Sequence, residues 1–118
     1  MSVDYSALSP QARGVAIKTA TLDATAADST EILCPRWANR VTVTFKTSAD
    51  ADDSGNLAFE GTDGAAIDAD NQPVASGGTF GFAVAAYEDM ALAFSIFVVA
   101  STNSAKCHVI FESESRGG

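Results

Sequence analysis

Acidic residues at alternate positions form the sharpest chemical motif in the sequence. Asp50, Asp52 and Ser54 offer side-chain oxygens and Gly55 follows, as in the first half of an EF-hand calcium loop. The twelfth position, where that loop carries a glutamate, is Gly61, and no helical pattern flanks the motif. We therefore keep Asp50, Asp52 and Ser54 as a weak calcium candidate, and the solvated tip of an acidic hairpin is the interpretation that fits better.

A single histidine restricts the kinds of catalysis that the chain could perform. His108 directly follows Cys107, and neighbouring side chains of a strand point to opposite faces, so the two cannot form a hydrogen-bonded catalytic pair. The sequence contains no GxSxG nucleophile elbow. Carboxylate pairs such as Glu88 and Asp89 could suggest glycosidase chemistry, but a solvated face explains them better. We predict no catalytic residues, no cofactor and no enzyme activity.

Two cysteines, Cys34 and Cys107, fall in predicted strands. They could form a disulfide, or they could remain reduced. The N-terminus has no cationic stretch leading into an apolar run, so we expect no secretion signal and favour reduced, half-buried thiols. There is neither a CxxC spacing nor a histidine cluster to support a zinc site.

Charge is distributed unevenly along the chain. The net charge of the 118 residues is −8, and residues 47–105 contain no Lys or Arg but nine acidic residues: Asp50, Asp52, Asp53, Glu60, Asp63, Asp68, Asp70, Glu88 and Asp89. Such a field repels phosphate backbones, so we expect no nucleic-acid partner. The longest apolar run, residues 90–100, is shorter than the roughly 20 residues that a membrane-spanning helix needs, so we expect no membrane partner.

Alternating apolar and polar residues predict an all-β fold. The clearest strand covers 40–47, where Val41, Val43 and Phe45 share one face. Further strands are predicted at 14–22, 29–35, 56–60, 79–85, 90–100 and 105–112, with a brief one at 65–67. We predict a single β-sandwich or jelly-roll-like domain over 14–118, with about seven or eight antiparallel strands and a short flexible C-terminus.

Three parts of the sequence are candidates for contacts between subunits. Residues 1–13 form a short N-terminal arm that either frays or orders against a neighbour. A Trp and two Arg lie between two predicted strands, where they serve either a core or an interface. The run 90–100 is apolar on both faces, which indicates a central strand or one covered by another subunit. The candidate interface residues are Val3, Tyr5, Leu8, Arg36, Trp37, Arg40, Phe97 and Val99.

In order and texture, four segments resemble small virion structural proteins of tailed bacteriophages: WANRVTVTF at 37–45, GNLAFEGTDGA at 55–65, PVASGGT at 73–79 and ALAFSIFVVAS at 91–101. The resemblance covers most of residues 14–112. It implies a capsid decoration (cement) protein that binds the major capsid protein where its subunits meet. It also implies a homo-oligomer, with a trimer favoured, in a virion assembled in the host cytoplasm. The alternative is a head-fibre or tail component that binds a receptor or carbohydrate.

Overall fold

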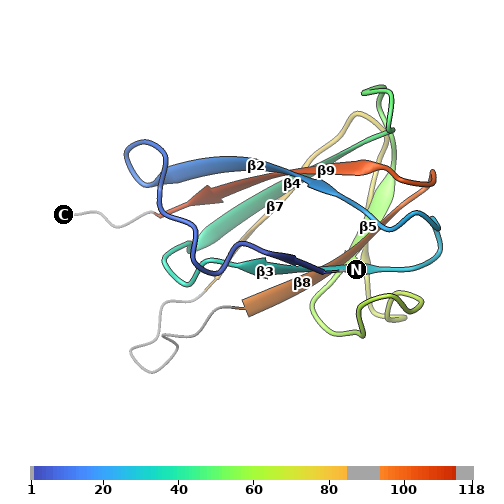
Figure 1. Ribbon diagram of the computed structural model, residues 1–118, viewed down its shortest axis with the longest axis horizontal. Helices are drawn as coiled ribbons and strands as arrows, with labels where there is room; N and C mark the ends of the chain where they lie inside the picture. The colour runs from blue at the N-terminus through green and yellow to red at the C-terminus, as the bar shows by residue number, and fades with distance from the viewer. Residues whose placement is uncertain (1, 85–93, 114–118) are drawn as a thin grey trace.

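Nine β-strands and no helix make up the part of the chain that the computed structural model describes, residues 2–84 and 94–113 (Figure 1). The all-β prediction is therefore confirmed. The strands are β1 (Ser2–Asp4), β2 (Val15–Thr21), β3 (Thr30–Cys34), β4 (Arg40–Lys46), β5 (Gly55–Ala58), β6 (Gln72–Val74), β7 (Phe80–Ala83), β8 (Phe94–Ala100) and β9 (Lys106–Glu112).

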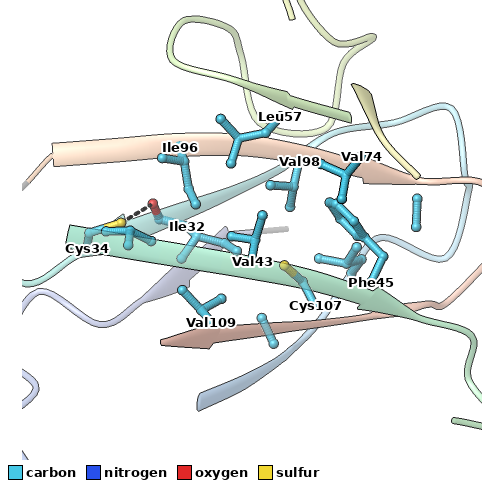
Figure 2. Packing of buried hydrophobic residues seen from close by; sticks show 14 of the residues in the cluster. Ile32, Cys34, Val43, Phe45, Leu57, Val74, Ile96, Val98, Cys107 and Val109 are labelled. Atoms are coloured by element: carbon cyan, nitrogen blue, oxygen red, sulfur yellow. Dashed lines mark hydrogen bonds between the residues drawn. The ribbon is translucent and has the colours of Figure 1, made fainter. Parts of the chain in front are cut away.

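The strands form two sheets, which we call the five-stranded sheet, with order β1-β3-β8-β5-β6, and the four-stranded sheet, with order β2-β9-β4-β7. Apolar side chains from both sheets point toward one another and form the core of a β-sandwich (Figure 2). The pairing departs from the expected antiparallel arrangement at one place, because β1 runs parallel to β3. A three-residue strand is too short for its alternation to be recognised in a sequence.

Alternation determines which side chains of the four-stranded sheet enter the core. Val41, Val43 and Phe45 of β4 are opposite Phe111, Val109 and Cys107 of β9, and all six are fully buried. The intervening residues of both strands remain partly exposed on the outer face. A slip of one residue in either strand would move its whole apolar set to solvent, so this register is strongly specified.

The two apolar faces of β8 have different neighbours. Ile96 and Val98 belong to the core between the sheets. Phe97 has the opposite facing and is only 7% exposed, because the loop at 59–71 covers it: a Cβ added to Gly61 would lie 3.2 Å from the Phe97 ring. β8 is thus central in its sheet and covered by its own chain. Residues 90–93 of the predicted strand lie outside the described residues.

Residues 2–13 of the predicted arm are docked on the body of their own chain. β1 pairs with β3, and the Tyr5 amide donates a hydrogen bond of 2.8 Å to the Leu33 carbonyl. The Tyr5 ring meets Phe111 edge to face, with centroids 5.8 Å apart. Trp37 Nε1 donates a 2.6 Å hydrogen bond to the Leu8 carbonyl. Aromatic and hydrogen-bonded contacts therefore attach this segment to the sandwich.

Candidate binding site

Each of the three residues of the calcium candidate has a hydrogen-bond partner within the chain: a lysine for each aspartate and a serine for Ser54. Asp50 Oδ1 accepts a hydrogen bond of 2.8 Å from Lys106 Nζ, and Asp52 Oδ1 accepts one of 2.6 Å from Lys46 Nζ. Ser54 Oγ lies 2.6 Å from Ser101 Oγ. The Lys106 bond and charge lower the pKa of the Asp50 carboxyl. Within residues 2–84 and 94–113, no three His, Cys, Asp or Glu side chains are grouped so that they could hold a metal ion.

The two thiols lie inside the sandwich, one in each sheet (Figure 2). Cys34 and Cys107 are free, and both are fully buried, whereas the sequence suggested half-buried positions. Burial raises the pKa of the Cys34 thiol to about 12, and burial together with the nearby Cys34 raises the pKa of Cys107. Neutral thiols enclosed by apolar neighbours behave as small core residues.

His108 of β9 lies on the outer face of the four-stranded sheet. It is paired with Thr19 of β2 on one side and with Thr44 of β4 on the other. Its Nδ1 is 3.0 Å from Thr19 Oγ1. The side chain of Cys107 is in the core instead. The two residues are therefore separated by the sheet. The carboxylate pair Glu88 and Asp89 lies outside the described residues.

Phenylalanines from both sheets surround an apolar pocket of about 570 Å³. We call this pocket the aromatic mouth; its described lining is Phe59, Phe82, Ala83, Val84, Phe94 and Ser95. Phe59 directly follows β5, Phe94 begins β8, and Phe82 comes from β7 of the opposite sheet. The described lining of the mouth therefore comes from β7 and β8, one strand of each sheet, and from Phe59 and Val84, which directly follow β5 and β7.

Ring contacts hold the aromatic mouth in shape. Phe59 and Phe82 meet edge to face, with centroids 4.9 Å apart and an angle of 82° between the rings. Phe80 stacks on Phe82 at 6.1 Å. Phe80 and Phe82 are two positions apart in β7, so they share a face of that strand, and both pack against the core. Edge-to-face and offset pairs of this kind are the favoured arrangements of aromatic rings.

Phe59 is 56% exposed, although it lies beside a pocket that would accept an apolar group. Ile17, also 56% exposed, is the other exposed large hydrophobic residue among those described, and it lies in β2 of the four-stranded sheet. A single exposed apolar residue needs no explanation, but one that borders an apolar pocket marks a candidate binding site.

Carboxylates border the same phenylalanine. A second hollow of about 210 Å³ is lined by Phe59 together with Glu60, Asp68 and Asp70. We call these three acidic residues the acidic rim. The Asp70 amide donates a 2.8 Å hydrogen bond to Asp68 Oδ1, which fixes the local turn of the chain. Phe59 therefore has an apolar pocket on one side and negative charge on the other.

The interface candidates from the sequence do not form one surface. Val3, Tyr5, Leu8 and Trp37 pack against the core, and Phe97 lies under the 59–71 loop. Arg36 is exposed in the turn before β4, Arg40 begins β4, and Val99 is in β8 of the other sheet, half-buried. Whether any of them contacts another subunit stays a prediction.

Sequence reasoning missed the aromatic mouth because its phenylalanines are far apart in the chain. Phe80 and Phe82 alternate like ordinary core residues, and Phe59 lies in a short apolar segment. The one local signal is the sequence Phe59-Glu60-Gly61, in which a large apolar residue, a charge and a turn former are adjacent. Such a sequence is also common at the end of any strand, so it does not identify a site by itself.

Comparisons with protein-family models, with curated proteins and with solved structures find no match. The binding role is therefore argued from the fold and the aromatic mouth. No helix in residues 2–84 and 94–113 has the length and apolar character needed to cross a membrane.

Proposed function

We propose that this protein is a structural component of a tailed-phage virion, a capsid decoration protein that binds the major capsid protein through the aromatic mouth. The observation that carries the binding role is the exposed Phe59 beside an apolar pocket that is lined by residues of β7 and β8, one strand of each sheet. The virion assignment is supported by the resemblance of the sequence to small phage structural proteins. The chain itself would be made in the host cytoplasm and act in the assembled particle.

The mouth suits a weak contact that is repeated many times. Covering the exposed part of Phe59 removes on the order of 100 Å² of apolar surface, which at about 25 cal/mol/Å² contributes roughly 2–3 kcal/mol. The Phe59 ring already contacts Phe82 edge to face, which reduces the side-chain entropy that binding would cost. On a shell with many identical sites, each bound copy shifts the equilibrium toward the assembled state by mass action.

The test is the presence of the chain in purified particles and its position there. We expect quantitative mass spectrometry to find it in proportion to the major capsid protein, and electron microscopy to place it where capsid subunits meet. A particle assembled with Phe59→Ser should lose the chain, because the apolar contact is removed. Ile17→Ser is the matched control, since Ile17 is equally exposed but lies in β2.

Two outcomes would contradict this function. The first is the absence of the chain from particles that otherwise contain their full set of structural proteins. The second is retention of the Phe59→Ser variant at the wild-type copy number. A low copy number at the connector or tail would instead indicate a tail component.

We also propose that the protein is a homo-oligomer, with a trimer favoured, as the resemblance implies. Light scattering during gel filtration gives the mass of the species in solution and so tests the trimer directly. A monomer at all concentrations would refute self-association in solution.

The second candidate function is a receptor- or carbohydrate-binding module in a head fibre or tail. It is favoured by the hollow beside Phe59, where an aromatic ring adjoins Glu60, Asp68 and Asp70. Sugar sites combine an apolar ring face with polar groups in this way. Specific hits on a glycan array that disappear in Phe59→Ser would favour this function over capsid decoration.

A further inference from the structure

We propose that the aromatic mouth and the acidic rim form one continuous site, and that it binds a segment of another protein in which an apolar side chain neighbours lysine or arginine. This inference deepens the proposed function, on which it rests, by stating the chemistry of the partner. The apolar side chain would enter the mouth, and the cation would lie over Glu60, Asp68 and Asp70.

The geometry that joins the two surfaces is the shared position of Phe59. The same side chain lines the apolar pocket and the acidic hollow. Phe59 and Glu60 are consecutive residues directly after β5, so the apolar and the acidic surfaces meet at one point of the backbone. A ligand that covers the exposed part of Phe59 therefore comes within reach of the rim.

Among the described residues, the rim carboxylates take part in no resolved salt bridge, in contrast to two aspartates in the loop that connects β4 to β5. There, Asp50 and Asp52 accept hydrogen bonds from Lys106 and Lys46. The salt bridges resolved within residues 2–84 and 94–113 join Asp50 to Lys106 and Asp52 to Lys46, and neither of them includes Glu60, Asp68 or Asp70. A positive charge over the rim would thus come from a partner.

Charge complementarity determines which partner the site favours. The rim would repel apolar segments that carry Asp or Glu. Apolar segments without charge would remove water from the rim carboxylates and offer no positive charge in return. A segment with Lys or Arg beside its apolar residue avoids both costs. The rim therefore selects between partners that would fit the mouth equally well.

The probe for this inference is an array of random short peptides incubated with the labelled full-length protein. We compare wild type, Phe59→Ser, the rim variant E60Q/D68N/D70N, and Ile17→Ser as the control. Peptides bound by wild type and by Ile17→Ser should be enriched in an aromatic or aliphatic residue next to Lys or Arg. Phe59→Ser should reduce binding roughly 30- to 100-fold, which corresponds to the apolar area of Phe59 that a bound peptide would cover.

The rim variant separates the charge argument from the apolar one. It should weaken binding of the enriched peptides about tenfold and remove the preference for Lys and Arg, while leaving binding of neutral apolar peptides unchanged or stronger. Binding of the enriched peptides should also weaken with added salt in wild type and respond less to salt in the rim variant.

Several results would overturn the inference. They are enrichment of apolar peptides without Lys or Arg, a rim variant that binds like wild type, and an array without enrichment. Self-association of the free protein that Phe59→Ser abolishes would also overturn it, because the mouth would then bind a second copy. None of these results affects the particle assay, so a chain that is found on the shell but shows no cationic preference would refute the partner chemistry alone.

Discussion

Replacing Phe97 with alanine tests whether this residue stabilises its own chain or serves mainly as a contact between subunits. The side chain is 7% exposed, and the neighbouring loop packs on its ring at Gly61. Removing a buried phenylalanine side chain typically costs about 3–5 kcal/mol, from lost apolar burial and the cavity that remains. We expect a value near the lower end, about 3 kcal/mol, because a surface loop can partly collapse onto the space.

The assay is urea denaturation at a protein concentration where wild type is monomeric. A loss of about 3 kcal/mol should lower the urea midpoint by roughly 2 M and the melting temperature by on the order of 10 °C. Phe59→Ala is the matched control, because it removes the same atoms from a side chain that is 56% exposed. It should cost about 1 kcal/mol, mainly the edge-to-face contact with Phe82.

We expect Phe97→Ala to destabilise the protein more than Phe59→Ala because only Phe97 is buried by its own chain. Equal losses in the free energy of unfolding would refute that explanation. A Phe97→Ala monomer as stable as wild type, combined with loss of an oligomer, would show that Phe97 acts mainly between subunits. In that case the 59–71 loop would not be the principal cover of β8.

Three further predictions concern other parts of the sandwich. Gly55→Ala should lower the free energy of unfolding by about 1–3 kcal/mol in urea titrations, because the added Cβ would lie 2.5 Å from the Val99 carbonyl oxygen and 2.7 Å from the Phe45 ring. A variant as stable as wild type would contradict this close packing. Cys34 and Cys107 should react with a thiol reagent only after unfolding. Burial raises the pKa of Cys34 from 9.0 to about 12 in the folded protein, so the contribution of the neutral thiol to stability is full below pH 9 and is lost as the pH rises toward 12. A free energy of unfolding that stays constant between pH 9 and 12 would argue against the burial of this thiol. Lys106→Met should raise the lowered pKa of Asp50 toward 3.8 in an NMR titration, and the stability that the pair contributes should disappear as the pH falls through the lowered value; an unchanged Asp50 titration would exclude the ion pair in solution.

The inner faces of the longer strands could be predicted from the sequence alone. In β4, Val41, Val43 and Phe45 alternate with polar residues. Because successive side chains of a strand point to opposite faces, a strand with one buried face must place these three side chains together in the core. The same holds for the last strand, where Val109 and Phe111 are fully buried. The uneven distribution of charge along the chain could also be established from the sequence, because the absence of Lys and Arg from 47–105 does not depend on folding.

Tertiary structure decided the features that depend on segments meeting from far apart in the chain. From the sequence, the apolar side chain of Phe97 could be covered either by its own chain or by another subunit. The tertiary structure brings Gly61 of the 59–71 loop against the Phe97 ring. Tyr5 lies in a segment too short for a periodic pattern, yet it packs on Phe111 more than a hundred positions away.

The aromatic mouth shows the same limit most directly. Phe82 lies in β7, Phe94 lies in β8 of the other sheet, and Phe59 directly follows β5, so none of the three is adjacent to another in the sequence. Alternation specifies which face of a strand is apolar, but it does not specify which strands stack or where one sheet ends before the other. The sequence therefore could not show that Phe59 remains exposed beside Phe82 of the other sheet.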